Sequence, residues 1–316
     1  MHILVTGGAG FIGSHLTDRL LSMGHRVSVI DSFSPFYDIS IKRKNLEKAR
    51  QSDNFSLYEI DLRDSENITE IFTLNDFDLV VHLASKAGVR PSIRLPRAYF
   101  DVNVNGTINI LEECRLHGID KVVYASSSSV YGNSANVPFK ETHNVDFPIS
   151  PYAASKKTGE LICHNYHHLY GINIYALRFF TVYGPRNRPD MGMFKFCKSI
   201  LEGKTINMYG HGKPRRDFTY IDDIIDGVIR SIERVSGFEI FNLGESQTIS
   251  VKELIEEFED VLGKKAILNP MEMQPGDVME TYADITKARE MLGYDPQTPV
   301  REGLRKLVQW YRESFL

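Results

Sequence analysis

The feature of this sequence that most restricts its fold is a glycine-rich run, TGGAGFIG at residues 6–13. It follows a short apolar segment and opens an amphipathic one whose apolar residues recur at helical spacing. Glycine at these positions lets backbone N–H groups approach a pyrophosphate at the helix N-terminus, where the helix dipole favours an anion. Gly7, Gly10 and Gly13 therefore predict a strand, a turn and a helix that together bind a dinucleotide.

Two acidic residues follow the next predicted strands. The strand at 26–30 ends in Asp31, where a carboxylate about 20 residues beyond the glycines accepts bonds from a ribose 2′-hydroxyl and repels a 2′-phosphate. Asp31 therefore favours NAD over NADP. Asp61 and Leu62 follow the third predicted strand and suit the adenine amino group, although Asp61 could instead cap the helix that begins near Asp64.

Apolar strands alternate with helices through the first half of the chain, which predicts a doubly wound parallel (Rossmann) α/β sheet. This rhythm ends after Arg178, in a segment rich in Pro, Gly, Arg and Asn. We expect an NAD-binding domain at 1–178, to which 218–242 returns, and a smaller mixed substrate domain at 179–316. Further strands are predicted at 79–83, 121–125 and 172–178, and helices at 11–23, 97–117, 151–170, 194–201, 222–234, 251–262 and 301–315.

The composition excludes several other classes of protein. The 316 residues carry a formal charge of −4, which argues against a nucleic-acid partner held by a basic surface. Cys114, Cys163 and Cys197 lack CxxC spacing, so we expect buried thiols with neither a disulfide framework nor a metal site. No apolar run is long enough for a membrane span and no export signal is recognisable, so a cytoplasmic location is expected.

The chemistry is indicated by Tyr152 and Lys156, which lie one turn apart on the predicted helix at 151–170. A free tyrosine has a pKa of about 10, and a neighbouring ammonium and a cationic nicotinamide both favour the phenolate. We therefore predict that Tyr152 takes a hydroxyl proton while hydride leaves the same carbon, and that Lys156 also bonds the nicotinamide ribose. A single YxxxK is common by chance, and this one gains weight from the dinucleotide motif before it.

A run of serines, 126–129, stands at the carboxyl end of the predicted strand at 121–125. Ligands of parallel sheets bind outside such strand ends. One hydroxyl of the run could pass a proton between a substrate oxygen and Tyr152. The alternative is that each serine is only a polar turn residue.

Five stretches in one order, TGGAGFIG, HLASKAGV, SSSSVYG, YAASK and RDFTYIDD, span essentially the whole chain. Together they resemble the extended short-chain dehydrogenase/reductase family, in its nucleotide-sugar epimerase and dehydratase branch. The resemblance implies a retained NAD, a catalytic trio and a homodimer through the helices at 97–117 and 151–170. The trio is Ser127, Tyr152 and Lys156, and the matching cofactor positions are Gly7, Gly10, Phe11, Ile12, Gly13, Asp31, Asp61, Leu62, His82, Leu83, Ala84, Ser85, Asn103, Tyr152, Lys156 and Phe179.

The serine run also limits which reaction of this branch the chain can catalyse. Dehydratases of the branch carry an Asp-Glu pair where this chain has its middle serines, so elimination of water lacks its acid and base. A simple redox cycle remains, in which a sugar is oxidised at C4, turned over and reduced on its other face. That cycle is a 4-epimerisation, with decarboxylation of a uronate and a catalytically silent dinucleotide-binding protein as more distant alternatives.

Two elements after the sixth strand bear on the sugar: TVYGP at 181–185 and RPDM at 188–191 resemble UDP-glucuronate 4-epimerases, whereas UDP-glucose epimerases have Asn at Thr181. The resemblance implies interconversion of UDP-glucuronate and UDP-galacturonate, with Arg188 and Thr181 holding the C6 carboxylate. A UDP-glucose or UDP-N-acetylhexosamine 4-epimerase is the alternative. Arg216 is expected at the diphosphate, Asp277 at the nucleotide ribose, and Arg215 in solvent. The substrate-binding residues expected are Ser85, Arg90, Ser127, Ser128, Thr181, Arg188, Arg216 and Asp277.

Overall fold

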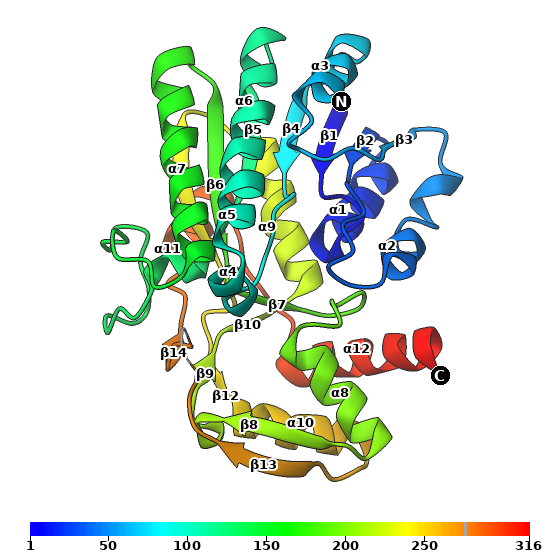
Figure 1. Ribbon diagram of the computed structural model, residues 1–316, viewed down its shortest axis with the longest axis vertical. Helices are drawn as coiled ribbons and strands as arrows, with labels where there is room; N and C mark the ends of the chain where they lie inside the picture. Colours follow the sequence, from blue (N-terminus) through cyan, green and yellow to red (C-terminus); the bar gives the residue numbers. More distant parts are fainter. Residues whose placement is uncertain (275–276) are drawn as a thin grey trace.

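The computed structural model describes residues 1–274 and 277–316 and is built around a parallel sheet of seven strands (Figure 1). All neighbouring strands of this sheet run in the same direction. The predicted doubly wound parallel fold is therefore confirmed. Across the sheet the order is β3 (Phe55–Tyr58), β2 (Arg26–Ile30), β1 (His2–Thr6), β4 (Leu79–His82), β5 (Lys121–Ser127), β6 (Asn173–Phe179) and β11 (Phe238–Leu243).

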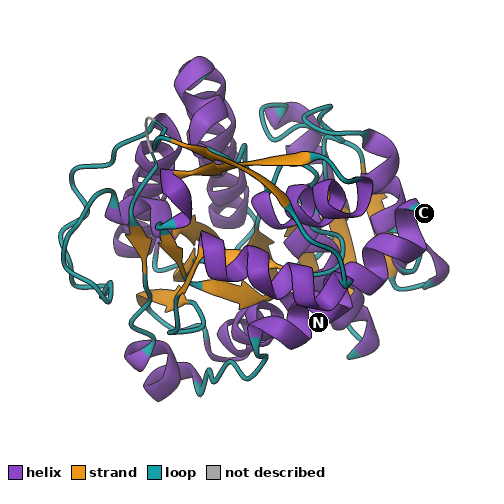
Figure 2. Ribbon diagram, turned by 90° about the horizontal axis from the view of Figure 1, so that it is seen from below, coloured by secondary structure: helices purple, strands orange, loops and turns teal. Residues whose placement is uncertain are grey.

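Helices cover both faces of this sheet (Figure 2), because alternate side chains of each strand point to opposite sides. In β1, Ile3 and Val5 join one buried cluster, whereas Leu4 joins the other. The first cluster is covered by α1 (Phe11–Ser22) and α9 (Ile221–Arg234), and the second by α3 (Ser65–Leu74), α6 (Gly106–Leu116) and α7 (Pro151–Tyr170). The remaining helices are α2 (Ile39–Asn45), α4 (Val89–Arg94), α5 (Pro96–Phe100), α8 (Gly192–Glu202), α10 (Val251–Leu262), α11 (Thr286–Leu292) and α12 (Val300–Phe315).

The helix predicted at 97–117 is interrupted. Between α5 and α6 lies a π-helical turn, η2 (Asp101–Asn105), of the kind often found near functional sites. Within it the buried Asn103 accepts a bond from Lys86 N and donates to Lys86 O and to Ser155 Oγ. The Asn103 side chain thus connects the π-helical turn to the segment after β4 and to the helix α7.

The second half of the chain packs at the carboxyl edge of the main sheet (Figure 1). Among the described residues it adds helices α8, α10 and α12 and three small sheets, made of four short strand pairings that sequence periodicity did not predict. The pairings are β7 (Thr181–Tyr183) with β10 (Phe218–Tyr220), β8 (Thr205–Tyr209) with β13 (Ile267–Met271), and β9 (Arg215–Arg216) with both β12 (Ile249–Ser250) and β14 (Glu280–Thr281).

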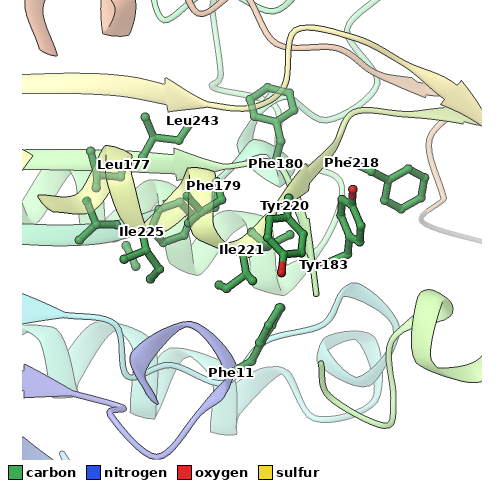
Figure 3. Close-up of a cluster of buried hydrophobic side chains, with 14 of the residues drawn as sticks. Phe11, Leu177, Phe179, Phe180, Tyr183, Phe218, Tyr220, Ile221, Ile225 and Leu243 are labelled. Atoms are coloured by element: carbon green, nitrogen blue, oxygen red, sulfur yellow. The ribbon is translucent and has the colours of Figure 1, made fainter. Parts of the chain in front are cut away.

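After β10 the chain returns to the main sheet through α9 and β11, before it adds the remaining strands of the small sheets. β11 pairs with β6 along its whole length. Figure 3 shows Leu177 and Leu243 of the main sheet in the same group of buried side chains as Ile221 and Ile225 of α9. The two halves therefore share one buried cluster. Residues 218–242 supply α9 and most of β11 to that cluster.

Asp217 ties three segments together where the halves meet. Its fully buried carboxylate accepts bonds from the backbone N–H groups of Glu245, Ser246 and Ala283, and from the Thr219 hydroxyl. Burial raises the pKa of Asp217 to about 6, although the bonds it accepts act in the opposite direction. This aspartate belongs to the RDFTYIDD stretch, and the structure gives it an architectural position.

Two further expectations concern the whole chain. Cys114, Cys163 and Cys197 are buried free thiols, as predicted. Among the described residues, no helix has both the length and the apolar character needed to cross a membrane.

Candidate active site

The glycine turn is packed so closely that larger side chains would not fit. A Cβ on Gly7, which has a φ of 74°, would lie 2.8 Å from the Ala84 backbone, and a Cβ on Gly13 would lie 2.2 Å from the Gly7 carbonyl oxygen. Gly10 is the N-cap of α1 and has no side chain that could occupy the first N–H groups of the helix. The start of α1, with Phe11 and Ile12, is thus able to accept an anion.

Asp31 lies directly beneath this turn, at the end of β2. Its buried carboxylate accepts bonds from Ala9 N at 3.1 Å and Phe33 N at 2.9 Å. The ammonium of Lys42 lies 3.6 Å from it and comes from α2, a short helix that the sequence analysis did not predict. Lys42 is therefore a residue of this site that was missed, because only the tertiary structure brings α2 against β2.

Asp61 does not cap a helix. Asp64 is the N-cap of α3, whereas the Asp61 carboxylate accepts bonds from Arg63 N, Nε and Nη2. These bonds lower the pKa of Asp61, so the group is an anion at the edge of the predicted adenine site. Leu62 is buried and packs against Gly106.

The end of β4 supports the turn from the other side. His82 bonds Thr6 Oγ1 at 2.8 Å and Thr107 Oγ1 at 3.0 Å, and burial lowers its pKa to about 3. His82 is thus a neutral linker between β1 and α6. Leu83 and Ala84 then run beside the glycine turn, where Ala84 N donates to Thr6 Oγ1.

The predicted catalytic side chains meet where α7 begins. Ser150 caps α7 and Pro151 starts it, which places Tyr152 in the first turn and Lys156 one turn later. Lys156 Nζ donates to Ala125 O at 2.7 Å, at the end of β5, two residues before Ser127. The helix and the strand thus bring these three residues together at one edge of the sheet.

The protonation of this trio differs in part from the expectation. Burial lowers the pKa of Lys156 to about 7. Burial also raises the pKa of Tyr152, while a hydrogen bond with the Ser127 hydroxyl and the charge of Arg188 lower it. Arg188 is therefore a cation that favours the phenolate and that was not predicted, in addition to the predicted Lys156 ammonium and nicotinamide.

A buried polar network behind the trio was not predicted. Arg178, on β6, donates from Nε and Nη2 to the two carboxylate oxygens of Glu160, on α7, both at 2.8 Å. The same carboxylate accepts from Ser126 Oγ at 2.6 Å, and Arg178 Nη1 donates to Tyr131 OH at 2.9 Å. Glu160 thus joins the catalytic helix to the strand end that carries Ser127. The available signal was a charged residue inside an apolar strand.

Arg188 lies close enough to Tyr152 for its charge to lower the pKa of that phenol. It donates from Nε and Nη2 to the two oxygens of Asp190, at 2.9 and 2.7 Å, and its guanidinium carbon lies 5.6 Å from the centre of the Phe36 ring. Thr181 begins β7, and its backbone N–H donates to Asp217 O. The predicted roles of Arg188 and Thr181 at a carboxylate stay predictions. Phe179 ends β6, just before Thr181.

The residues expected at the nucleotide also gather in one place. Arg90 Nη2 lies 2.7 Å from Asp277 Oδ2, and its guanidinium covers the Tyr209 ring. Arg216 donates to Val278 O at 2.6 Å. Arg215 is not solely in solvent, since it bonds Thr248 and Glu253. Pro275 and Gly276, next to Asp277, lie outside the described residues.

The two remaining predicted serines lie near the ends of β4 and β5. Ser85 follows β4, and Ser128 opens a short 3-10 helix, η3 (Ser128–Tyr131); both are half-buried. Over residues 1–274 and 277–316, no group of three or more His, Cys, Asp or Glu side chains could hold a metal ion.

The glycine turn, the Asp31 carboxylate and the helix that carries Tyr152 and Lys156 together form a Rossmann-type dinucleotide site at the carboxyl edge of the sheet. The model of the GDP-mannose 4,6 dehydratase family matches residues 4–307. The chain belongs to this family, which lies within the extended short-chain dehydrogenases/reductases, so the predicted resemblance is confirmed.

Several relatives of this chain have names that include a substrate. The chain is 44% identical to the UDP-glucuronate 4-epimerase of Thermodesulfobacterium geofontis, over 99% of this chain and 97% of that protein. It is 42% identical to UDP-glucuronate 4-epimerase 4 of Arabidopsis thaliana, over 99% of this chain and 76% of that protein. The structure is similar to that of UDP-glucuronic acid 4-epimerase from Bacillus cereus in complex with UDP-glucuronic acid and NAD, with a TM-score of 0.94, 36% identity and full coverage of both chains.

Proposed function

We propose that this chain is an NAD-dependent 4-epimerase that interconverts UDP-glucuronate and UDP-galacturonate. The observation that carries the proposal is the half-buried Arg188 guanidinium, whose charge acts on Tyr152, in a site whose serine run has no acid-base pair for elimination. An arginine fork matches a carboxylate, which distinguishes a uronate from a hexose. The named relatives support the same substrate.

The residues fit NAD. The Gly7, Gly10 and Gly13 turn would receive the pyrophosphate, because no side chain caps the first N–H groups of α1 and because the turn is too tightly packed for a Cβ on Gly7 or Gly13. Asp31, which accepts a bond from Ala9 N of this turn, would accept bonds from the adenosine ribose, and Phe11, Ile12, Leu83, Ala84, Ser85 and Phe179 would line the cofactor. Bound NAD would supply a hydride acceptor and donor for C4 of the sugar.

Tyr152 would move the C4 hydroxyl proton, with Ser127 as the relay. Its pKa is raised by burial, so Arg188, and a bound cationic cofactor, would have to favour the phenolate. Lys156, already fixed on Ala125 O, would bond the cofactor ribose and keep the phenol in place. Ser128 lies next to Ser127 and would line the sugar pocket.

Arg188 and Thr181 would hold the C6 carboxylate. Oxidation at C4 of a uronate creates a β-keto acid, which loses CO2 when the C5–carboxylate bond aligns with the carbonyl π system. A fixed clamp would keep that bond near the carbonyl plane while the ring turns over. At the other end, Arg90 and Arg216 would face the diphosphate and Asp277 the ribose, and the Arg90–Asp277 pair would open to admit them.

We also propose the organisation of the protein. Residues 1–178 would form the NAD-binding domain, with 218–242 returning to it, and 179–316 the nucleotide-sugar domain. A homodimer would form through α5, α6 and α7, which expose Phe100, Leu116, Leu161 and Leu169, and sedimentation equilibrium would test it. The buried, unpaired cysteines suit a cytoplasmic location, which fractionation of the source cells would test.

The decisive experiment supplies the purified protein with UDP-glucuronate and UDP-glucose in separate reactions and follows the products by NMR. We expect UDP-galacturonate from the first, little product from the second, and NAD retained through purification. Tyr152→Phe should lower kcat by about 10²–10⁴-fold without changing the melting temperature. Turnover of UDP-glucose alone, or Tyr152→Phe at full rate, would contradict the proposal.

A further inference from the structure

Arg188 is held by its own neighbour in a defined orientation. The loop at 188–191 forms a turn closed by a hydrogen bond from Met191 N to Arg188 O, and Pro189 occupies its second position, where proline fixes the backbone. Asp190, at the third position, accepts the Nε and Nη2 hydrogens of Arg188 on its two oxygens. Because the two residues lie in the same tight turn, Asp190 fixes the orientation of the Nε–Nη2 edge of the Arg188 guanidinium.

The other edge of the guanidinium is left for a ligand. Arginine has five N–H donors, and Asp190 takes one from Nε and one from Nη2. The hydrogen bonds that the described residues make to this side chain involve no other donor. Because Phe36 covers its plane, the remaining donors, on Nη1 and Nη2, form an end-on fork.

Arg188 lies close to Tyr152. Its charge lowers the pKa of Tyr152 and also that of Tyr99, whose ring packs edge-on against the Tyr152 ring with the centroids 6.3 Å apart. A sugar bound at Tyr152 through its C4 hydroxyl would carry its carboxylate two carbons away and would present it to Arg188. The direction of the free fork would then set the direction of the C5–carboxylate bond.

We propose that Asp190 is a positioning residue that keeps the 4-keto uronate from losing CO2. It rests on the proposed function. By fixing the Nε–Nη2 edge of Arg188, Asp190 aims the end-on fork so that the C5–carboxylate bond stays near the plane of the C4 carbonyl. If that bond turns out of the plane, it breaks, its electron pair enters the carbonyl π system and CO2 leaves. C5 then takes a proton, and a pentose results when the hydride returns to C4 and O4 takes back the proton that Tyr152 removed.

The test is the ratio of UDP-pentose to UDP-galacturonate, measured by NMR on the full-length protein with UDP-glucuronate. Asp190→Asn keeps the size and one acceptor but loses the second, and we expect the ratio to rise by about tenfold. Asp190→Glu keeps the charge but displaces the fork by one methylene, and should give an intermediate ratio. The ratio does not depend on how much protein is folded, so a poorly folding variant remains informative.

The matched control is Asp226→Asn, which removes the carboxylate from another Arg–Asp pair, with Arg230, on the surface of α9. It should keep the wild-type ratio, whereas Arg188→Ala should exceed every Asp190 variant. Wild-type ratios in both Asp190 variants, with Arg188→Ala raised, would overturn the role of Asp190 alone. A wild-type protein that forms no UDP-galacturonate would overturn the proposed function itself.

Discussion

Two arginine–carboxylate pairs of this protein have the same hydrogen-bond geometry but different surroundings. Arg178 with Glu160 and Arg188 with Asp190 both use Nε and Nη2 on the two carboxylate oxygens. The side chains of the first pair are each 1% exposed, whereas those of the second are 20% and 32% exposed. The difference is whether another group can still reach the arginine.

The partners of each pair explain that difference. Glu160 also accepts from Ser126, and Arg178 also donates to Tyr131, whose hydroxyl bonds Asn242 on β11. The first pair is thus completed by its own fold and connects α7 to three strands. In the second pair, the hydrogen bonds of the described residues leave the Nη1 hydrogens and one Nη2 hydrogen of Arg188 for a ligand. An arginine has a structural role when the surrounding fold uses all of its N–H donors. It can bind a ligand when some of those donors have no partner in the fold.

The largest effect is expected from breaking the buried pair. Glu160→Leu leaves Arg178 charged and unpaired in the interior, and should lower the free energy of unfolding by about 3–5 kcal/mol. Urea denaturation would measure it. The double variant Glu160→Leu/Arg178→Met removes both charges and should recover most of the loss. Equal losses in the single and the double variant would show that the charge pairing is not the cause.

Lys156 sharpens the comparison, because it is a buried cation whose hydrogen-bond partner is a carbonyl and not a carboxylate. Burial lowers its pKa from 10.5 to about 7, so between these values the unfolded chain binds the additional proton. Stability from this group therefore rises with pH above 7, approaching ~1.4 kcal/mol per pH unit. Denaturation midpoints from pH 6 to 9 should show this slope in the cofactor-free wild type relative to Lys156→Met; parallel curves would refute it.

The smallest effect is expected at the open pair. Asp190→Asn should change the free energy of unfolding by less than about 1 kcal/mol, because Arg188 can be rehydrated when its partner loses charge. Thermal unfolding followed by circular dichroism would measure it beside Glu160→Leu. If both variants lost equal stability, the two pairs would have the same structural role.

The site was only partly predictable from sequence. The glycine turn, Asp31 and the Tyr152–Lys156 spacing are local patterns, and each lies on the predicted strand, turn or helix. Lys42, Glu160 and Arg178 were missed because their partners are distant in sequence or on unpredicted elements. The interruption of the helix at 97–117 was also missed, since apolar spacing does not distinguish a π-helical turn from an α-helical one.

The sequence by itself determined the parallel α/β sheet, the cofactor turn and the spacing of the catalytic pair, because backbone periodicity and glycine sterics act over a few residues. Only the tertiary structure decided which charges are neutralised. It placed Asp190 on one edge of Arg188 and enclosed Glu160 with Arg178. The physical reason is that the free energy of a charge depends on its exposure to water and on its neighbours, and packing sets both.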